Sequence, residues 1–565
     1  MEGLKGILMS RIWILRNSIA GIKSEPRLKI IFISASIMVF WFGSLALFHR
    51  GLSFFHEFPI IGPALVDESI YIFSAVLFIM LTLSSVIICY TTYYSSKEVA
   101  FLFSKPIDTR VILFYRFFQS VIFGSWAFLF LGVTFMLAYG LIKDVSFWFY
   151  LFLPFYFVAF ITLPAAIASI VVLTAVRFID YRTVKYILAV TLCIGASLLY
   201  WHYKQNIAPA LLTRNEIGYF LDNFLDNFLY HIRIFKHPLF PGCWMAKSLI
   251  NLSINNFKDG LFYFLAFTTT VLFFLQVNWF MAGKIFYSGW LSSVRGNSKK
   301  YNPPGRGLVN RAAWSLPFVP RSTAAMITKD IKIFFRDFGQ WSQFLIYFAI
   351  LVIYIFNLRN MPQITDNIYW KMIVTFLNLS ATVLVLAGFT VRFLFPLISL
   401  EGSKFWILGL APITFRGLIL QKFIINFGGV FLVSEFLMVA TNIILKTGAS
   451  LMYISCGLAA MASIGLVGLS IGLGTVYPNF KEDNSAKIVS GFGGTLNFII
   501  ALLYVSFIII LFAVPYFSFE IHGAISGHTF HLFLIFSWTV SLIATIAVGI
   551  LPMILGYRNL ENMDF

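Results

Sequence analysis

The chain has 565 residues, of which 59% are hydrophobic, 18% aromatic and only 11% charged. Proteins that fold in water carry about 25% charged residues, so this composition excludes a single water-soluble domain and predicts a protein that crosses a membrane several times. The net charge of +18 does not require a nucleic-acid partner, because Lys and Arg also gather on the cytosolic side of membrane spans. We expect no nucleic acid to bind.

The N-terminal segment MEGLKGILMSRIWILRNSIAGIKSEPRLK predicts an amphipathic helix on the inner membrane face. Lys5, Arg11 and Arg16 interrupt its apolar residues, so it lacks the continuous apolar core of a secretory signal. The apolar residues recur at helical spacing, at Leu4, Ile7, Leu8, Ile12, Leu15, Ile19 and Ile22. A surface helix of a cytosolic domain is the alternative, but the span that follows directly favours the membrane.

Apolar windows predict about twelve membrane spans, since a helix needs about 20 apolar residues to cross a bilayer. The first set lies near residues 28–48, 69–93, 117–141, 147–175, 185–201 and 261–283. The second set lies near residues 341–358, 371–398, 423–445, 450–476, 488–513 and 533–556. With the N-terminus in the cytosol, about 30 of the 41 Lys and Arg residues fall inside and about 11 outside, as the positive-inside rule requires.

A polar segment divides the chain into two halves. The sequence RGNSKKYNPPGRG is rich in Pro, Gly and charge and is expected to be a loop, within a cytosolic linker at 284–328. The first half is then 1–283, with an outer amphipathic insertion at 202–260, and the second half is 329–565. We predict an all-α polytopic membrane protein with about twelve transmembrane helices in two tandem six-helix halves, each preceded by an amphipathic interfacial helix.

The sequence pattern of one predicted cytosolic turn occurs twice in the chain. FSKPIDTRVILFYRFF begins at Phe103 and LGLAPITFRGLILQKFI begins at Leu408, and both contain Pro-Ile, two residues, an Arg, five residues and a second base. These positions are Pro106, Arg110 and Arg116 in the first copy and Pro412, Arg416 and Lys422 in the second. Any short hairpin needs a breaker and anchoring bases, but matched order and spacing favour an internal duplication. Asp108 and Thr414 are expected to cap new helices, and the four bases to reach lipid phosphates.

The segments around the turns, SSKEVAFLFSKPIDTRVILFYRF and LEGSKFWILGLAPITFRGLILQKF, resemble the cytoplasmic signature of permease subunits of exporter-type, type-2 ATP-binding-cassette transporters. GTVYPNFKEDNSAKIVSGFGGTLNFI at 474–499 resembles a later stretch of the same permeases. HPLFPGCWMAKSL at 237–249 is similar to their outer segment before the sixth span. The resemblance covers nearly the whole chain, and the order of the motifs is more specific than any one of them.

The resemblance implies six spans per half and a short cytosolic coupling helix that docks on a separate ATP-hydrolysing subunit. A rigid helix continuous with two spans can carry movement of the ATPase into the membrane. The predicted ATPase-coupling residues are Glu98, Pro106, Arg110, Glu401, Pro412 and Arg416. The copies differ in one respect, because Glu98 precedes its proline by eight residues and Glu401 by eleven. We expect the two halves to hold the ATPases unequally.

Common nucleotide-binding and catalytic motifs are absent from the sequence. No segment matches Gly-x-x-x-x-Gly-Lys-Ser/Thr, the loop that binds the phosphates of ATP, so we expect no ATPase motif and no cofactor in this chain. The chain would then not be an enzyme, and ATP would bind to a partner subunit. Gly-x-Ser-x-Gly and His-Glu-x-x-His are absent as well. All eight histidines fall in segments assigned to the outside, and no Cys or Asp closely joins the three in IHGAISGHTFH, so we predict no metal site.

Three residues inside predicted spans stand out. Glu435 is a carboxylate in hydrocarbon, which is costly and often functional. Its functional interpretations are a group that lines the substrate path or a proton site in a secondary carrier, and the alternative is a structural hydrogen bond between helices. Gly468 and Gly472 form a small-x-x-x-small pair that is predicted to allow close helix packing.

Together these features predict the permease subunit of an ATP-binding-cassette exporter in the cell inner membrane, with both termini in the cytosol. Its expected partners are separate ATP-binding-cassette ATPase subunits, the lipid bilayer and an unidentified substrate, for which an amphiphile is a candidate. A secondary carrier is the first alternative; it predicts paired charges at mid-membrane, which are scarce apart from Glu435. A membrane-embedded lipid-linked transferase is the second; it needs clustered acidic or His residues near a membrane face, and the cytosolic loops have none.

Overall fold

The computed structural model describes most of the chain. The described ranges are 27–57, 62–178, 236–237, 240–296, 321–336, 368–411, 414–445, 447–482, 485–520 and 527–563, with isolated positions at 6, 9, 13, 16 and 17. Every regular element in these ranges is a helix and none is a strand. This result confirms the predicted all-α polytopic membrane fold, in which each backbone hydrogen bond is satisfied within its own helix.

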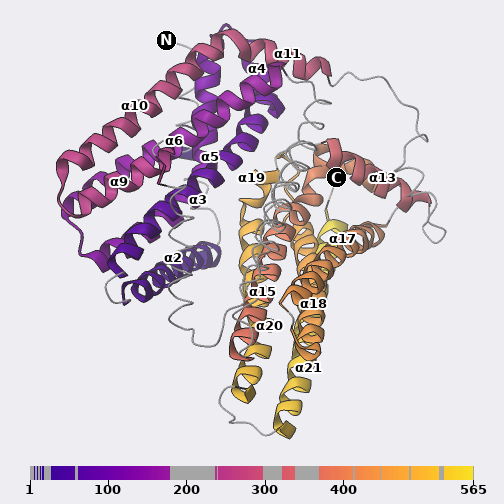
Figure 1. Ribbon diagram of the computed structural model, residues 1–565. Coiled ribbons are helices and arrows are strands. Elements are labelled where there is room, and N and C mark those ends of the chain that lie inside the picture. Colours follow the sequence, from indigo (N-terminus) through magenta and orange to yellow (C-terminus); the bar gives the residue numbers. More distant parts are fainter. Residues whose placement is uncertain are drawn as a thin grey trace. The chain divides into compact units, whose positions relative to one another are not determined.

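The chain divides into two compact units, Met1–Tyr301 and Asn302–Phe565. The first unit is coloured from indigo to rose and the second from salmon to yellow in Figure 1. The sequence-based domain boundaries at 283 and 329 stay a prediction. Of the predicted outer insertion, residues 202–235 lie outside the described ranges.

The first unit is a bundle of long helices, with α2 (Arg27–His56), α3 (Gly62–Tyr90), α5 (Thr109–Lys143), α6 (Phe147–Phe178) and α10 (Phe257–Met281). Shorter elements are α4 (Lys97–Phe103), α9 (Pro241–Ser253) and α11 (Tyr287–Gly296), and the π-helices η1 (Thr91–Ser95) and η2 (Ala282–Phe286). The helix α6 contacts α3, α5 and α10 (Figure 1). Aromatic side chains fill the space between these helices, for example Phe128 stacked on Phe160 with ring centroids 5.1 Å apart.

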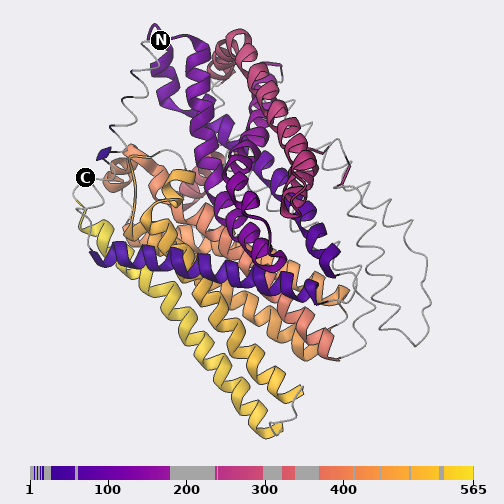
Figure 2. The same cartoon turned by 90° about the vertical axis from the view of Figure 1, so that its left-hand side faces the viewer.

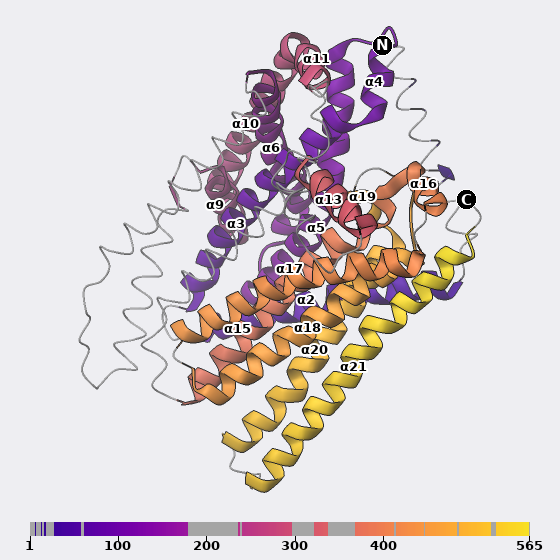
Figure 3. The same cartoon turned by 90° about the vertical axis from the view of Figure 1, so that its right-hand side faces the viewer.

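The second unit is built around one central helix. Its long helices are α13 (Arg321–Arg336), α15 (Ile368–Phe389), α17 (Phe415–Ile444), α18 (Ala449–Val476), α20 (Phe492–Glu520) and α21 (Gly527–Glu561). Its short elements are η4 (Thr390–Leu394), η5 (Phe395–Leu397), η6 (Ser399–Lys404), α16 (Phe405–Leu410) and α19 (Ser485–Val489). The helix α18 contacts α15, α17, α20 and α21, and α20 runs beside α21 (Figures 2 and 3).

Nine helices in the described ranges are long and apolar enough to cross a membrane, and a bent pair brings the number to ten. The bent pair is α5, whose parts Thr109–Ser125 and Phe128–Lys143 meet at 53°. Ten of the predicted spans coincide with these helices, and the remaining two, near 185–201 and 341–358, lie outside the described ranges. The helical rod that begins at Phe257 continues to Ser293, beyond the predicted end at 283.

Glycines bring the central helix against its neighbours. A Cβ atom at Gly468 would lie 2.6 Å from the Gly549 carbonyl oxygen, and one at Gly472 would lie 2.5 Å from the Pro552 carbonyl carbon. A side chain at Gly474 would also meet the backbone carbonyl of Phe395. The backbones of α18, α21 and η5 therefore approach one another at a distance that only glycine permits.

Candidate functional site

The two repeated turns are each preceded by a π-helix at the end of a long span. In the first unit η1 follows α3, and in the second unit η4 follows α15. A π-helix closes i to i+5 hydrogen bonds and occurs mostly as a single turn within α-helices, frequently at functional sites. The same irregularity therefore stands at the same place in both units.

Local hydrogen bonds shape the first turn. The helix α4 ends where the Ser104 N–H donates to the Phe101 carbonyl oxygen over 3.1 Å. The Ile107 N–H donates to the Lys105 carbonyl oxygen over 2.7 Å, which closes a tight turn around Pro106. The Asp108 carboxylate then accepts from the N–H of residue 110 over 3.0 Å and caps α5, as the sequence predicted.

Arg116, the second base of the first turn, is buried and ion-paired. Its side chain is 2% exposed, and its Nη2 atom lies 2.8 Å from the Glu98 Oε2 atom. Its Nη1 atom donates to the Gln119 Oε1 atom over 2.7 Å. The expectation that Arg116 reaches lipid phosphates is wrong, because a guanidinium that leaves water needs fixed acceptors and finds them inside the protein.

The first turn rests on the end of the α10–α11 rod. Phe103 of α4 lies 5.1 Å from Trp290 of α11, measured between ring centroids, and both helices lie at the same end of the unit (Figure 3). Beneath them Phe286 is fully buried, and the Tyr93 hydroxyl donates to the Ser169 Oγ atom over 3.0 Å. The first turn therefore packs on the α10–α11 rod, and η1, which precedes the turn, is hydrogen-bonded to α6.

The second turn is longer and follows a different local path. After η5 and η6 the chain bends at Gly402, which has φ 63° and ψ −151°, a conformation that favours glycine. The helix α16 leads to the turn proper, and the Thr414 Oγ1 atom accepts from the Gly417 N–H over 3.2 Å, which caps α17 as predicted. Pro412 lies outside the described residues.

Four charged side chains meet beside the second turn. Lys422, the second base, is 1% exposed, and its Nζ atom lies 3.2 Å from the Glu401 Oε1 atom and 3.3 Å from the Asp330 Oδ2 atom. Lys329 donates to both oxygens of Glu401, over 2.6 and 2.8 Å. We call Lys329, Asp330, Glu401 and Lys422 the charge cluster. Its two cations and two carboxylates neutralise each other, so the expectation of lipid contact is wrong for Lys422 too.

The two turns place their carboxylates on equivalent partners in spite of unequal spacing. Glu98 precedes Arg116 by 18 residues and Glu401 precedes Lys422 by 21, yet each carboxylate contacts the second base of its own turn. The additional residues of the second turn are taken up by η5, η6 and the bend at Gly402. The ion pair between turn and following span is thus the feature that the units share.

The remaining predicted coupling residues differ in their surroundings. Pro106 and Arg416 are exposed. Arg110 packs against α10 and η2. Its guanidinium carbon lies 6.0 Å from the ring centroid of Trp279, and a Cβ atom at Gly283 would lie 2.6 Å from its Nε atom. The structure therefore brings Glu98 and Glu401 into ion pairs and separates Arg110 from them.

Glu435 is half-buried on α17, and its side chain interacts with the thiol of Cys456 on α18. Its Oε1 atom is buried without a hydrogen-bond partner in the described part of the chain. No group of three or more His, Cys, Asp or Glu residues that could hold a metal occurs in that part either. The role of Glu435 in a substrate path stays a prediction.

Sequence reasoning missed four partners in these ion pairs, namely Arg116, Lys329, Asp330 and Lys422. The signal for two of them was present, because the second base recurs at one spacing in both turns. Lys329 and Asp330 carry no such signal, since ordinary charges on an amphipathic helix face water.

Comparison with known proteins identifies one relationship. A family model with the description "Putative ATP-binding cassette" matches residues 22–565, nearly the whole chain. No curated protein and no solved structure matched the chain.

The family description corrects the resemblance drawn from the sequence. It names the cassette itself, whereas the motifs pointed to a permease subunit that works with a separate cassette. The exporter function powered by another subunit rested on that resemblance, and the family description contradicts it too. The absence of enzymatic activity and the location of ATP only on a partner rested on the missing phosphate-binding motif, and the description contradicts both.

The error has a physical reason. Motif order around membrane spans reports how the chain is threaded through the bilayer, and it does not report which polypeptide binds the nucleotide. The printed sequence contains no Gly-x-x-x-x-Gly-Lys-Ser/Thr segment, so the family description and not a motif carries the correction. With a match over residues 22–565, the chain belongs to the family described as an ATP-binding cassette.

Proposed function

We propose that this chain is a membrane-embedded transport protein in which ATP drives movement of the spans through the two ion-paired turns. The single observation that carries the proposal is the repeated ion pair, Glu98 with Arg116 and Glu401 with Lys422. Each pair ties a short turn to the first part of the long helix that follows. The family description, an ATP-binding cassette, supports ATP as the energy source that we propose.

The mechanical argument is that a turn moves a span only if the two move together. Each capped helix start is continuous with a span, and each ion pair closes the turn onto that span at a second point. A lever fixed at two points transmits a displacement as a rigid-body tilt, whereas a loose loop absorbs it. We assign coupling to Glu98, Pro106, Glu401, Pro412 and Arg416, and give Arg110 another role below.

The charge bias supports the cellular placement that we propose. In the topology that we propose, both turns lie on the side that carries most of the Lys and Arg residues, the cytosolic side of an inner membrane. Both termini then lie in the cytosol. The transported substrate is unidentified, and Glu435 is the candidate polar group along its path.

The experiment is ATP binding and hydrolysis by the full-length chain, purified in mild detergent with whatever protein stays bound to it. We expect hydrolysis to fall about tenfold in the Glu98→Gln/Glu401→Gln double variant, the change that follows from losing roughly 1.4 kcal/mol of coupling. ATP binding should be unchanged. The matched control is Glu57→Gln, an exposed carboxylate at the end of α2 outside both turns.

Mass spectrometry of the same preparation, after labelling with a photoreactive ATP analogue, identifies the polypeptide that holds the nucleotide, either this chain or an associated one. The proposal fails if the preparation neither binds nor hydrolyses ATP. It also fails if the double variant hydrolyses ATP like the Glu57→Gln control.

A further inference from the structure

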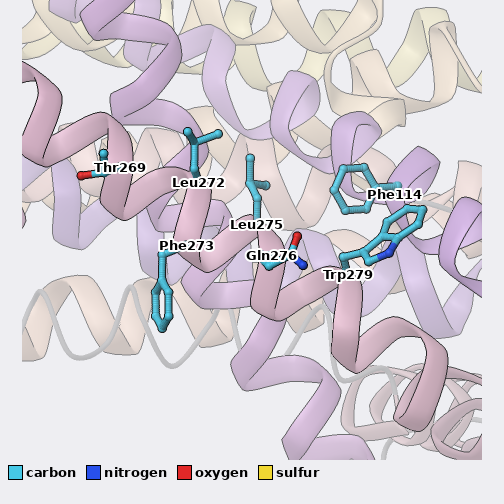
Figure 4. Close-up of a pocket in the computed structure, with 7 residues that line it drawn as sticks. All are labelled: Phe114, Thr269, Leu272, Phe273, Leu275, Gln276 and Trp279. Atoms are coloured by element: carbon cyan, nitrogen blue, oxygen red, sulfur yellow. The ribbon is translucent and has the colours of Figure 1, made fainter.

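A groove lies on the surface of the first unit, between α5 and α10. It has a volume of about 770 Å³ and is lined by Phe114, Thr269, Leu272, Phe273, Leu275, Gln276 and Trp279 (Figure 4). Six of these seven side chains come from α10. Leu272 and Phe273 are 60% and 63% exposed, as expected of side chains that face hydrocarbon. From Thr269 to Trp279 the groove follows about 15 Å of helix, at 1.5 Å per residue.

One end of the groove is aromatic and positively charged. The rings of Trp279 and Phe114 meet edge to face with centroids 5.1 Å apart, as Figure 4 shows at the right of the groove. The Arg110 guanidinium lies over the same Trp279 ring. Trp is the side chain that marks the boundary between hydrocarbon and headgroups. This end of the groove therefore lies at headgroup level, and Arg110 supplies its charge.

Arg110 has no carboxylate partner among the described residues. Its backbone N–H donates to Asp108, but the structure shows no ion pair to its guanidinium. Arg116, six residues later, is by contrast buried against Glu98. Arg110 thus presents an uncompensated cation beside an apolar groove, which is the charge complement of an anionic headgroup.

Gln276 provides a second polar contact one turn deeper. Its side chain is exposed within an apolar span, and no hydrogen bond to it is found in the described part of the chain. An unsatisfied amide is costly in hydrocarbon. Gln276 and Trp279 are three residues apart and lie on the same face, so the amide faces the region where a lipid carries its ester groups. Thr269, at the far end, already donates its hydroxyl to the Ala266 carbonyl oxygen over 2.9 Å.

We propose that this groove binds one membrane phospholipid with an anionic headgroup. Its phosphate pairs with the Arg110 guanidinium, its ester region accepts from the Gln276 amide, and one acyl chain lies along Leu272, Phe273 and Leu275. The second unit does not repeat the arrangement, because Arg416, the counterpart of Arg110, has no aromatic ring stacked beneath it among the described residues.

The test is lipid binding by the full-length chain in detergent, followed by native mass spectrometry. The probes are dioleoyl phosphatidylglycerol, which is anionic, and dioleoyl phosphatidylcholine, which is zwitterionic. We expect tighter binding of the anionic lipid and a loss of about fivefold in Arg110→Ala, with the zwitterionic lipid unaffected. The matched control Arg416→Ala removes the corresponding base of the second unit and should bind both lipids like the unchanged chain.

Two further variants separate charge from folding. Arg110→Lys keeps the charge and should retain most of the preference for the anionic lipid. Leu272→Trp fills the groove and should weaken both lipids. Glycerol 1-phosphate, which offers the headgroup without chains, should not displace the lipid.

Several results would overturn the proposal. One is equal binding of the two lipids by the unchanged chain. Another is an equal effect of Arg110→Ala and Arg416→Ala, or a loss in Arg110→Lys as large as in Arg110→Ala. Displacement by glycerol 1-phosphate would show a site for free phosphate instead. None of these readouts depends on ATP, so failure here leaves the proposed transport function standing, and the reverse also holds.

Discussion

The two turns share one sequence pattern but are held by different sets of charges. In the first unit Arg116 uses its two terminal nitrogens on Glu98 and Gln119, and Glu98 remains 52% exposed. In the second unit Lys422 belongs to a cluster of four charges that also ties in α13 through Lys329 and Asp330. The comparison teaches that a repeated turn can keep its ion pair while one copy gains a further anchor on the helix α13. The second turn should be the stiffer one.

Removal of Glu401 should produce the largest difference between the turns. Glu401→Ala leaves Lys422, which is 1% exposed, with Asp330 as its remaining carboxylate, and breaking a buried pair in this way costs about 3 kcal/mol. Glu98→Ala should cost less, about 2 kcal/mol, because its carboxylate is half in solvent although the Arg116 guanidinium that it pairs with is buried. Thermal unfolding of the detergent-solubilised chain measures both. Equal losses in the two variants would remove the asymmetry argued here.

Glycine packing sharpens the comparison in the second unit. Gly472→Val forces a side chain into the backbone of Pro552 and Met553, and overpacking of this kind costs about 2 kcal/mol. The control is Gly428→Ala on α17, where an added Cβ atom meets nothing within 4 Å. That variant should be neutral or slightly stabilising, since Ala favours a helix more than Gly. If both variants behave alike in thermal unfolding, the close approach of α18 and α21 does not contribute to the stability of the second unit.

Exchange of the two second bases tests whether each turn is built for its own cation. Arg116→Lys removes one of the two terminal nitrogens used by Glu98 and Gln119 and should cost about 1 kcal/mol. Lys422→Arg places a larger group in a fully buried site and should also cost about 1 kcal/mol. The same unfolding assay applies, with Arg416→Lys on an exposed base as control. Two neutral exchanges would mean that the cations are interchangeable.

Salt should produce the smallest effect and should act on one turn. The Glu98–Arg116 pair is partly in water. Raising the salt concentration from 0.05 to 1 M should therefore reduce its contribution to the free energy of unfolding by about 0.3 kcal/mol. The charge cluster is mostly withdrawn from water and should respond less. Hydrogen exchange of residues 97–103 should therefore speed up with salt, while exchange of residues 415–422 stays constant. The reverse order would contradict the burial that distinguishes the turns.

Much of the fold could be predicted from the sequence, because apolar runs of span length leave few alternatives in a bilayer. Helix starts were also predictable, since Asp108 and Thr414 precede their helices by the spacing that capping requires. The long amphiphilic side chains of Arg116 and Lys422 led to the wrong expectation that both residues reach lipid phosphates. A long basic side chain at the end of a span reaches lipid or a carboxylate equally well, and only the path of the chain decides which.

The partner of Glu401 on α13 could not be predicted, because Lys329 lies 72 residues away on an amphipathic helix whose docking depends on tertiary packing. The same holds for Arg110, whose contact with Trp279 joins α5 to α10. The polypeptide that binds ATP could not be inferred correctly either. A family match over residues 22–565 corrected it, while the sequence around the spans offers no motif for the nucleotide.

The most direct test of the coupling role is hydrogen exchange of both turns with and without a non-hydrolysable ATP analogue, on the full-length chain in the preparation that binds ATP. We predict that the analogue slows exchange in residues 97–108 and 399–411 together, and that Glu98→Gln/Glu401→Gln abolishes the response in both. An analogue that binds and leaves both turns unchanged in the unsubstituted chain would contradict the account.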